Sequence, residues 1–425
     1  MNLCEFTDDI IIEILLRTPA KDLVTSKTVC KRWYNIISDS SFVNTHLHHS
    51  NNCRSRKGII LKPSGGDYWR LDEYSTKIDR KNMSVEKFNL NIVIPGKKKS
   101  VSIIASCNGL LLLRSYSGSS SCHGKFYICN LVTRESTALP RINDPRRRRS
   151  LETLCVLRCK WAFSYDTSVE RYKVFAIWRE HVIMLTSGDK KWINISFPTR
   201  ICKDYPHITP PVFAERELHW VASQFRNVGA MSCACSLDVE SREFREIELP
   251  IYNAYHYAIF APFNIKGSIS VTIVFDNHLE IWSLAHKANN QWTQNISVSF
   301  QSFLKNTPYS LCNICIVGMK EDIDSNDISD MKLKIFIPDG DKLLYHDLSG
   351  ELRQIASMNN ELIVNGAYQF HIDSLVSWNP AQAKRKRKRR RSAEHDRTTT
   401  RDCNQAIPND YIELRNKRRI PRRGH

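Results

Sequence analysis

Among the residue types that could form a chemical site, only the cysteines show a spacing typical of one, because pairs of cysteine thiolates a few residues apart bind zinc. Fourteen cysteines are scattered along the 425 residues, and Cys312-x-x-Cys315 has the spacing of a zinc-ligand pair. No second pair follows it, and on a strand its two side chains would point to opposite faces. Cys155-x-x-x-Cys159 and Cys233-x-Cys235 are no better placed. The sequence therefore predicts no metal site and no cofactor, and cysteines buried as small hydrophobic residues.

Catalytic motifs are missing from the sequence. It contains no His-Glu-x-x-His, no P-loop, no Gly-x-Ser-x-Gly and no dinucleotide-binding glycine fingerprint. The histidines in the middle of the chain are dispersed, and we expect structural or surface roles for them: His181, His207, His219, His256, His278 and His286. The prediction is a protein that is not an enzyme.

The composition is that of a globular protein with a strong basic excess. Hydrophobic residues make up 42%, and the formal net charge is +18. Acidic residues at Glu5, Asp8, Asp9 and Glu13 do not fit a signal or transit peptide, and no apolar run approaches the ~20 residues of a membrane span. We expect a soluble intracellular protein of two or three domains that does not contact a membrane.

Residues 6–47 have the pattern of three or four short helices. Thr7 and Asp8 can cap a first helix, and Pro19 ends it and can begin the next. Ser38, Asp39, Ser40 and Ser41 offer a cap for one more turn. The first helix is apolar around most of its circumference, which exceeds the arc of roughly 100° that a surface helix needs. Because so short a unit buries little surface alone, this excess predicts a protein partner.

This segment resembles an F-box. The matching residues are Asp8, Asp9, Glu13-Ile14-Leu15, Pro19, Lys21, Leu23, Val29-Cys30-Lys31, Trp33, Ser38-Asp39, Phe42 and His46-Leu47. The segment departs from the family pattern at Phe6, Thr7 and Thr18, where Leu, Pro and Leu are usual. The resemblance implies a partner, the BTB-fold Skp adaptor, and through it a cullin. The residues it implies as adaptor-binding are Phe6, Ile10, Leu15, Leu23, Val29, Cys30 and Trp33. The alternative is a helical cap on the larger domain.

From about Ile59 to Trp378 the pattern changes to short strands separated by turns. A unit of strand, polar turn and strand recurs, for example at Leu218–Ala222 and Lys342–Leu352. The spacing of Pro140, Pro198 and Pro250 is close to the ~50 residues of a kelch-type blade. We therefore predict a mostly β fold: a small N-terminal helical domain followed by a β-propeller of roughly six blades. A pair of β-sandwiches is the second interpretation.

The same region is similar to the F-box-associated domain of a large plant family. The matching pieces come in the family's order: Asn108-Gly109-Leu110-Leu111, the segment NLVTRESTALP, Phe163–Val174, Pro211–Ala222, SLDVESREF, and EIWSL followed by Trp292. At Asn130-Leu131 the family often has Asn-Pro, and Glu215-Arg216 replace a usual Gly. The predicted domain boundaries are an F-box at 1–48, a linker at 49–58, the propeller at 59–378 and a tail at 379–425.

Loops on one face of a propeller are the usual place for target binding. An aromatic cluster after Pro250 is a candidate: Tyr252, Tyr255, His256 and Tyr257. The same residues could instead pack at a blade edge. Arg146–Arg149 could bind an acidic target or be solvated. A sugar-oxidising propeller enzyme is disfavoured, because the sequence offers no set of metal ligands.

The tail is dominated by basic residues, and such blocks repel themselves and stay disordered. Its densest run is Lys384, Arg385, Lys386, Arg387, Lys388, Arg389, Arg390 and Arg391. This run predicts a nuclear-import signal read by an importin, with a nuclear and also cytoplasmic location. Without interleaved aromatic residues, it predicts weak and non-specific contact with nucleic acid at most.

The sequence-based hypothesis is a non-catalytic, substrate-recognition subunit of a Skp–cullin–F-box ubiquitin ligase. The F-box would bind the adaptor, and propeller loops would bind a target protein. The alternative hypothesis is a nuclear interaction protein that contacts nucleic acid through its basic tail.

Overall fold

The structure is a computed structural model, and helices and strands make up most of what it describes. The described residues are 6–52, 57–63, 68–72, 85–88, 90, 100–116, 124–142, 159–178, 181–196, 207–214, 216–226, 229–250, 259–265, 268–275, 278–286, 290–299, 315–320, 331–339, 342–347, 352–357 and 363–378.

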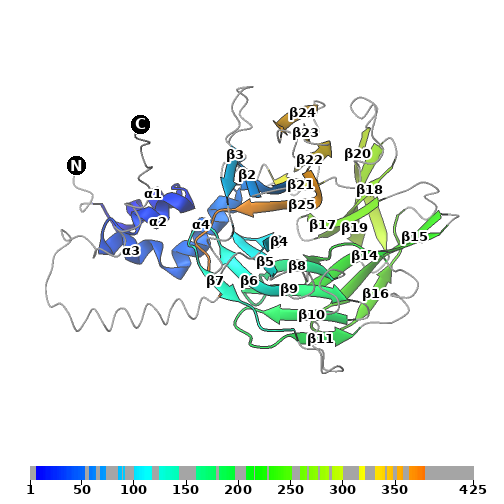
Figure 1. The fold of residues 1–425 in the computed structure, drawn as a ribbon, viewed down its shortest axis with the longest axis horizontal. Coiled ribbons are helices and arrows are strands. Elements are labelled where there is room, and N and C mark those ends of the chain that lie inside the picture. Colours follow the sequence, from blue (N-terminus) through cyan, green and yellow to red (C-terminus); the bar gives the residue numbers. More distant parts are fainter. Residues whose placement is uncertain are drawn as a thin grey trace, which may run out of the picture.

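Four helices come first, in a unit beside the strands (Figure 1). They are α1 (Asp8–Leu16), α2 (Ala20–Ser26), α3 (Lys31–Ile37) and α4 (Ser40–Asn52). Thr7 is the N-cap residue of α1, without a side-chain capping bond, and Pro19 is the N-cap residue of α2. The carboxylate of Asp39 accepts a hydrogen bond from the amide of Ser41 at 2.9 Å, at the start of α4.

Helix α4 is much longer than the single turn that the sequence predicts. It has 13 residues and continues to Asn52, into the segment predicted as linker. The reason is that one side of α4 is buried: Phe42, His46 and Ser50 recur every fourth residue and are each at most 6% exposed. The first strand begins at Lys57, two residues before the predicted domain boundary.

Within the described residues, the strands form six antiparallel sheets that follow one another around the domain in chain order (Figure 1). We call these sheets the blades of the propeller. Blade 1 contains β1 (Lys57–Pro63), β2 (Tyr68–Asp72) and β3 (Val85–Phe88). Blade 2 contains β4 (Ser100–Cys107), β5 (Leu110–Tyr116), β6 (Gly124–Asn130) and β7 (Ser136–Ala138). Blade 3 contains β8 (Lys160–Asp166), β9 (Arg171–Trp178), β10 (His181–Thr186) and β11 (Ile193–Ser196).

The remaining blades also have their strands in chain order across the sheet, except that the first two strands of blade 4 both pair with its third. Blade 4 contains β12 (His207–Ile208), β13 (Val212–Ala214), β14 (Glu217–Arg226), β15 (Gly229–Asp238) and β16 (Phe244–Ile247). Blade 5 contains β17 (Ile259–Ile265), β18 (Ser268–Val274), β19 (His278–His286) and β20 (Gln291–Ser299). Blade 6 contains β21 (Cys315–Lys320), β22 (Met331–Asp339), β23 (Lys342–Asp347) and β24 (Leu352–Ser357). The predicted mostly β fold with about six blades is confirmed, and the sandwich interpretation is wrong.

The last strand closes the ring. Strand β25 (Ile363–Ile372) pairs antiparallel with β1, for example Ile59 opposite Phe370, and so completes blade 1. The four strands of this sheet lie in the order β25-β1-β2-β3. The first blade is therefore built from both ends of the propeller sequence.

Blade 2 buries both faces against its neighbours, as the run of four leucines in β5 shows. Leu110 and Leu112 lie in the core between blades 2 and 3, and Leu111 and Leu113 lie in the core between blades 1 and 2. Successive side chains of a strand point to opposite faces, so a strand between two blades needs apolar residues at every position. Each leucine is at most 1% exposed, and burial of this kind contributes about 1.5–3 kcal/mol per side chain.

Tight turns join neighbouring strands in blades 2 and 4. Asn108 and Gly109 join β4 to β5, both with positive φ (49° and 84°), as a type I′ hairpin turn requires. The outer turns of blades 2 and 4 repeat one sequence pattern, Asn130–Glu135 and Asp238–Glu243, in which Arg134 and Arg242 have positive φ. These turns correspond to the repeat that the sequence predicts.

Candidate functional site: the outer surface of the helical unit

Helix α1 divides its isoleucines and leucines between an inner and an outer side. Ile11 and Leu15 are each 1% exposed and lie in the core of the helical unit. Ile10 and Ile14, four residues apart on the other side, are 46% and 47% exposed. Residues at this spacing are neighbours on a helix surface, so the two side chains form one apolar stripe. Glu13 of the same helix pairs with Arg17 at 2.9 Å.

A third exposed apolar residue lies between α2 and α3. Val29 is 56% exposed, the largest value among the exposed large hydrophobic side chains of the described residues. Next to it, Cys30 is the N-cap residue of α3, and its sulfur accepts a hydrogen bond from the amide of Trp33 at 3.5 Å. Trp33 is half-buried and packs partly on the core of the helical unit.

Arg32 joins α3 to the start of α1. Its Nε donates to Asp8 Oδ1 at 2.7 Å, and its NH2 group donates to the carbonyl of Phe6 at 2.6 Å. The backbone at Phe6 is thereby held against the helical unit, although it precedes the first helix. Phe6 itself is half-buried and packs on the same core. The segment that opens the unit is thus fixed by a charged side chain from its third helix.

Two of the seven predicted adaptor-binding residues are buried in the helical unit. Leu15 and Leu23 are 1% and 0% exposed, because they fill the core in which the helices meet. Ile10 and Val29 are exposed, and Phe6, Cys30 and Trp33 are half-buried. The structure adds Ile14, which the sequence-based set omits. Its signal was available, since Ile14 lies one helical turn from Ile10.

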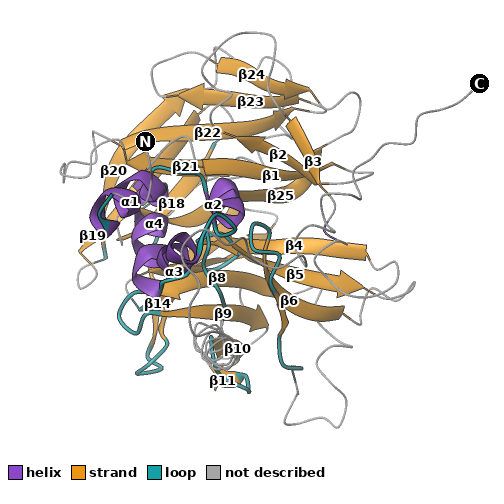
Figure 2. Cartoon of the chain, turned by 90° about the vertical axis from the view of Figure 1, so that its left-hand side faces the viewer, coloured by secondary structure: helices purple, strands orange, loops and turns teal. Residues whose placement is uncertain are grey.

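The other side of the helical unit rests on the propeller (Figure 2). Leu375, which follows β25, and Val132, from the outer turn of blade 2, join the core of the helices. In return, Val43 and Leu47 of α4 pack on the core between blades 2 and 3. Lys21 of α2 lies 4.0 Å from the carboxylate of Asp373. The helical unit therefore packs on the propeller on one side and also has exposed apolar residues.

The remaining predicted sites lie elsewhere. Tyr252, Tyr255, His256 and Tyr257 are outside the described residues, as are Lys384–Arg391, Arg146–Arg149 and Cys312. Within the described part of the chain, no group of three His, Cys, Asp or Glu side chains could hold a metal ion. The longest described helix has 13 residues, and none in that part of the chain is long and apolar enough to span a membrane. His219 is buried, at 2% exposed, and His278 stacks on Phe275 with ring centroids 4.4 Å apart.

Comparison with known proteins matches both parts of the chain. Residues 3–45 match the F-box domain, and residues 67–336 match the F-box associated beta propeller domain. The F-box protein At5g49610 of Arabidopsis thaliana is 25% identical over 335 residues, which cover 74% of this chain and 84% of that protein. The F-box protein At4g19940 of the same plant is 24% identical over 320 residues, covering 69% of this chain and 72% of the relative.

The second match spans more than half of the chain, and its limits lie within the six-bladed ring. The first ends inside α4. The two matches thus correspond to the helical unit and the ring of strands described above. This chain belongs to the family of F-box proteins with an F-box associated β-propeller domain.

Proposed function

We propose that this protein is the substrate receptor of a Skp–cullin–F-box ubiquitin ligase. The observation that carries the proposal is the exposure of three large apolar side chains on the helical unit, Ile10, Ile14 and Val29. Five large hydrophobic side chains are exposed among the described residues, and these three lie on the helical unit. An apolar surface on a unit that is already seated on its own propeller suits a separate protein partner. That partner is the BTB-fold Skp adaptor, which would connect the chain to a cullin.

The role in ubiquitin transfer is to position a target, and the chain supplies no nucleophile of its own. A target held by the propeller would be kept at high effective concentration near an activated thioester bound elsewhere in the complex. The chain from 248 to 258, with Tyr252, Tyr255, His256 and Tyr257, connects β16 to β17 and is our candidate for target contact. It connects the last strand of blade 4 to the first strand of blade 5 in the chain.

The test is adaptor binding by two matched double variants of the full chain. Ile10→Asp with Val29→Asp places two charges on the proposed adaptor surface, and we expect at least a hundredfold loss of affinity for a purified Skp-type adaptor. Val169→Asp with Ile193→Asp changes two residues of blade 3 that are similarly exposed, at 44% and 41%. This control should bind as the unaltered chain does. Equal adaptor binding by both double variants would sink the proposal.

In this proposal the basic tail serves only as a localisation signal. Import through Lys384–Arg391 by an importin, and a nuclear as well as cytoplasmic location, stay predictions from charge alone. The alternative, a nuclear protein that contacts nucleic acid through this tail, predicts that removing residues 384–425 abolishes the main activity. The receptor model predicts intact adaptor binding after the same deletion.

A further inference from the structure

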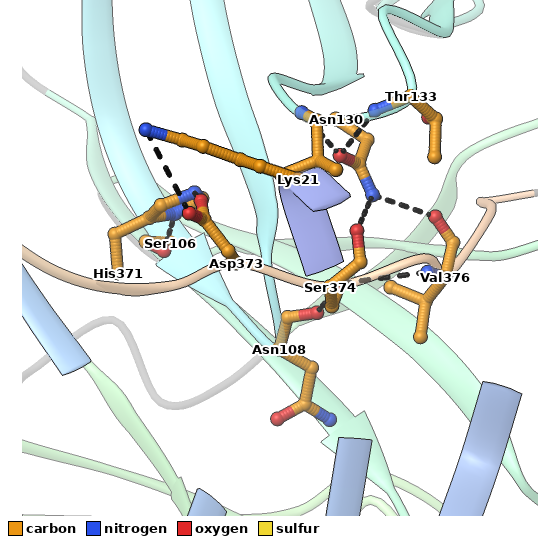
Figure 3. A network of polar contacts seen from close by, with 10 residues as sticks. Lys21, Ser106, Asn108, Asn130, Thr133, His371, Asp373, Ser374 and Val376 are labelled. Atoms are coloured by element: carbon orange, nitrogen blue, oxygen red, sulfur yellow. Dashed lines mark hydrogen bonds and ion pairs between the residues drawn. The ribbon is translucent and has the colours of Figure 1, made fainter. Parts of the chain in front are cut away.

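Residues 373–378 follow the closing strand β25 and run between the helices and the propeller; we call this segment the strap (Figure 3). Its side chains alternate between the two sides, as they do in any extended chain. Asp373 lies 4.0 Å from Lys21 of α2, and Leu375, 7% exposed, is part of the core of the helical unit. The odd-numbered positions 373 and 375 therefore contact the helices.

The even-numbered positions of the strap contact the propeller. The hydroxyl of Ser374 donates to the carbonyl of Asn108 at 2.7 Å, in the turn between β4 and β5. Val376 and Trp378 are 5% and 6% exposed and lie in the core between blades 2 and 3, where Trp378 contacts the rings of Phe163 and Tyr172. One segment thus joins two hydrophobic cores.

Asn130 holds the strap in place from the end of β6. Its Nδ2 donates to the carbonyls of Ser374 and Val376, both at 2.9 Å. Its Oδ1 accepts from the amides of Val132 and Thr133 at 2.8 and 3.1 Å. Asn130 is 1% exposed, and these four bonds use the full capacity of its amide group. Figure 3 shows the side chain between its own turn and the strap.

The matching turn of blade 4 shows which of these bonds the turn itself needs. There Asp238 Oδ1 accepts from the amides of Glu240 and Ser241 at 2.8 and 2.9 Å. The backbone closes in the same way in both turns, with Asn130 N to Glu135 O at 2.9 Å and Asp238 N to Glu243 O at 3.0 Å. The turn requires only the side-chain oxygen. The amide nitrogen at position 130 serves the strap.

We propose that the F-box helices dock firmly on the propeller only when β25 has closed the ring, with Asn130 and Leu375 as the positioning residues. The strap reaches its place because β25 is paired with β1 in the residues directly before it, Lys57 opposite Ile372. Ring closure and helix docking therefore share one segment. On the basis of the proposed function, the strap sets the orientation of the adaptor surface relative to the blades that hold a target.

Hydrogen–deuterium exchange of the full-length chain tests this docking, with Asn130→Asp and the matched control Asp238→Asn. Both substitutions keep the turn's acceptor oxygen, but Asn130→Asp removes the two donors to the strap. We expect exchange in α4 and the strap to become at least about tenfold faster in Asn130→Asp, since it loses two buried hydrogen bonds. Exchange in β14 and β15 should be unchanged, and Asp238→Asn should leave α4 and the strap as they are. Equal exchange in the two variants would overturn the proposal.

Leu375→Ala keeps the test decisive if Asn130→Asp does not fold, because it alters only a strap side chain that faces the helices. We expect faster exchange in α1 and α4 with β25 still protected. Helices as protected as in the unaltered chain would overturn the inference.

Titration with a purified Skp-type adaptor separates this inference from the proposed function. The strap variants leave Ile10, Ile14 and Val29 untouched, so their adaptor affinity should stay within about twofold of the unaltered chain. Loss of affinity in Leu375→Ala would show that the strap shapes the adaptor surface and would overturn a positioning role. An unaltered chain that binds no adaptor would overturn the proposed function, while the exchange result would still decide the docking.

Discussion

Asn130 shows how one residue type can be set by two parts of the fold at once. Its turn accepts either Asn or Asp, as the equivalent Asp238 demonstrates with the same pair of backbone amides. The strap carbonyls that require an amide donor at this position lie 244 and 246 residues away in the chain. The sequence could predict a turn at this position. It could not predict why the side chain is an amide, because that reason comes from a distant segment.

Gly109 is constrained by its own backbone and by the strap, and we expect Gly109→Ala to destabilise the chain strongly. Its φ is +84°, and an added Cβ would lie 2.6 Å from the carbonyl oxygen of Ile372 and closer still to the Ser374 hydroxyl. The left-handed backbone costs an L-residue about 1–2 kcal/mol, and overpacking adds about 1–3 kcal/mol. The free energy of unfolding, measured by urea titration, should therefore fall by about 2–5 kcal/mol.

Gly188→Ala is the matched control for this substitution. Gly188 has a similar φ of +91°, but the atom that its added Cβ would meet is the end of the Arg171 side chain, which can move. We expect only the backbone cost of about 1–2 kcal/mol. Equal losses in the two variants would show that the strap does not press on the turn between β4 and β5.

At the scale of elements, the β8–β9 hairpin contains a buried charge pair that the sequence pattern does not predict. Lys173 Nζ lies 2.6 Å from Asp166 Oδ2, and the two side chains are 7% and 3% exposed. Asp166 Oδ1 also accepts from the amide and the hydroxyl of Ser168, at 2.9 and 2.6 Å, in the hairpin turn. Lys173 Nζ lies 5.5 Å from the ring centre of Phe213 in blade 4. A lysine in a strand pattern is ordinarily expected to be exposed, so this pair was not predictable.

Stability should depend on pH through this pair. Burial alone would raise the pKa of Asp166, but the bonds from Lys173 and Ser168 outweigh it and hold the pKa below the ordinary value of 3.8. Because the folded-state pKa is below the unfolded one, the pair contributes fully above about pH 4, and its contribution is lost as pH falls through the folded-state pKa. The free energy of unfolding of the unaltered chain should therefore fall steeply below pH 4.

Removing one partner or both distinguishes this pair from other acidic groups. Asp166→Asn leaves the Lys173 charge buried without a partner and should cost about 3–5 kcal/mol at pH 7. Asp166→Asn combined with Lys173→Met should cost less, because no unpaired charge remains. In urea titrations between pH 7 and 3, the free energy of unfolding of the double variant should depend less on pH than that of the unaltered chain. The same slope in both chains would contradict a role for this pair in acid stability.

Some features of the helices could be predicted from the sequence and others could not. Thr7, Asp8 and Pro19 correctly predicted where α1 and α2 begin, because those signals are local. The length of α4 was missed, since Phe42, His46 and Ser50 become one buried side only when the propeller and the other helices are present. For the same reason Leu15 and Leu23 could not be separated from Ile10 by sequence. An apolar residue of a short helix can face a partner or a core.

For the whole molecule, a ring of about six blades in chain order was predictable, because blades 2 to 6 are each built from consecutive strands. Ring closure was not, since β25 and β1 are separated by almost the entire propeller sequence. The ring therefore depends on one long-range pairing, which carries the strap with it. Removing residues 363–378 removes the fourth strand of blade 1, the contacts of the strap with the helices and the interblade contacts of Val376 and Trp378 together.

A chain that ends at residue 362 lacks β25 and the strap, and we expect an added peptide of these residues to restore the missing contacts. It would present the unpaired edge of β1 and, on the propeller, the empty places of Val376 and Trp378. An added peptide of residues 363–378 should bind to this chain, with a change in the fluorescence of Trp378 as it becomes buried, and should restore protection of α4 in hydrogen–deuterium exchange. A peptide with Leu375→Ala should bind but restore α4 less, because only its propeller-facing residues are intact. A truncated chain whose α4 is protected without any peptide would show that closure by β25 is dispensable for seating the helices.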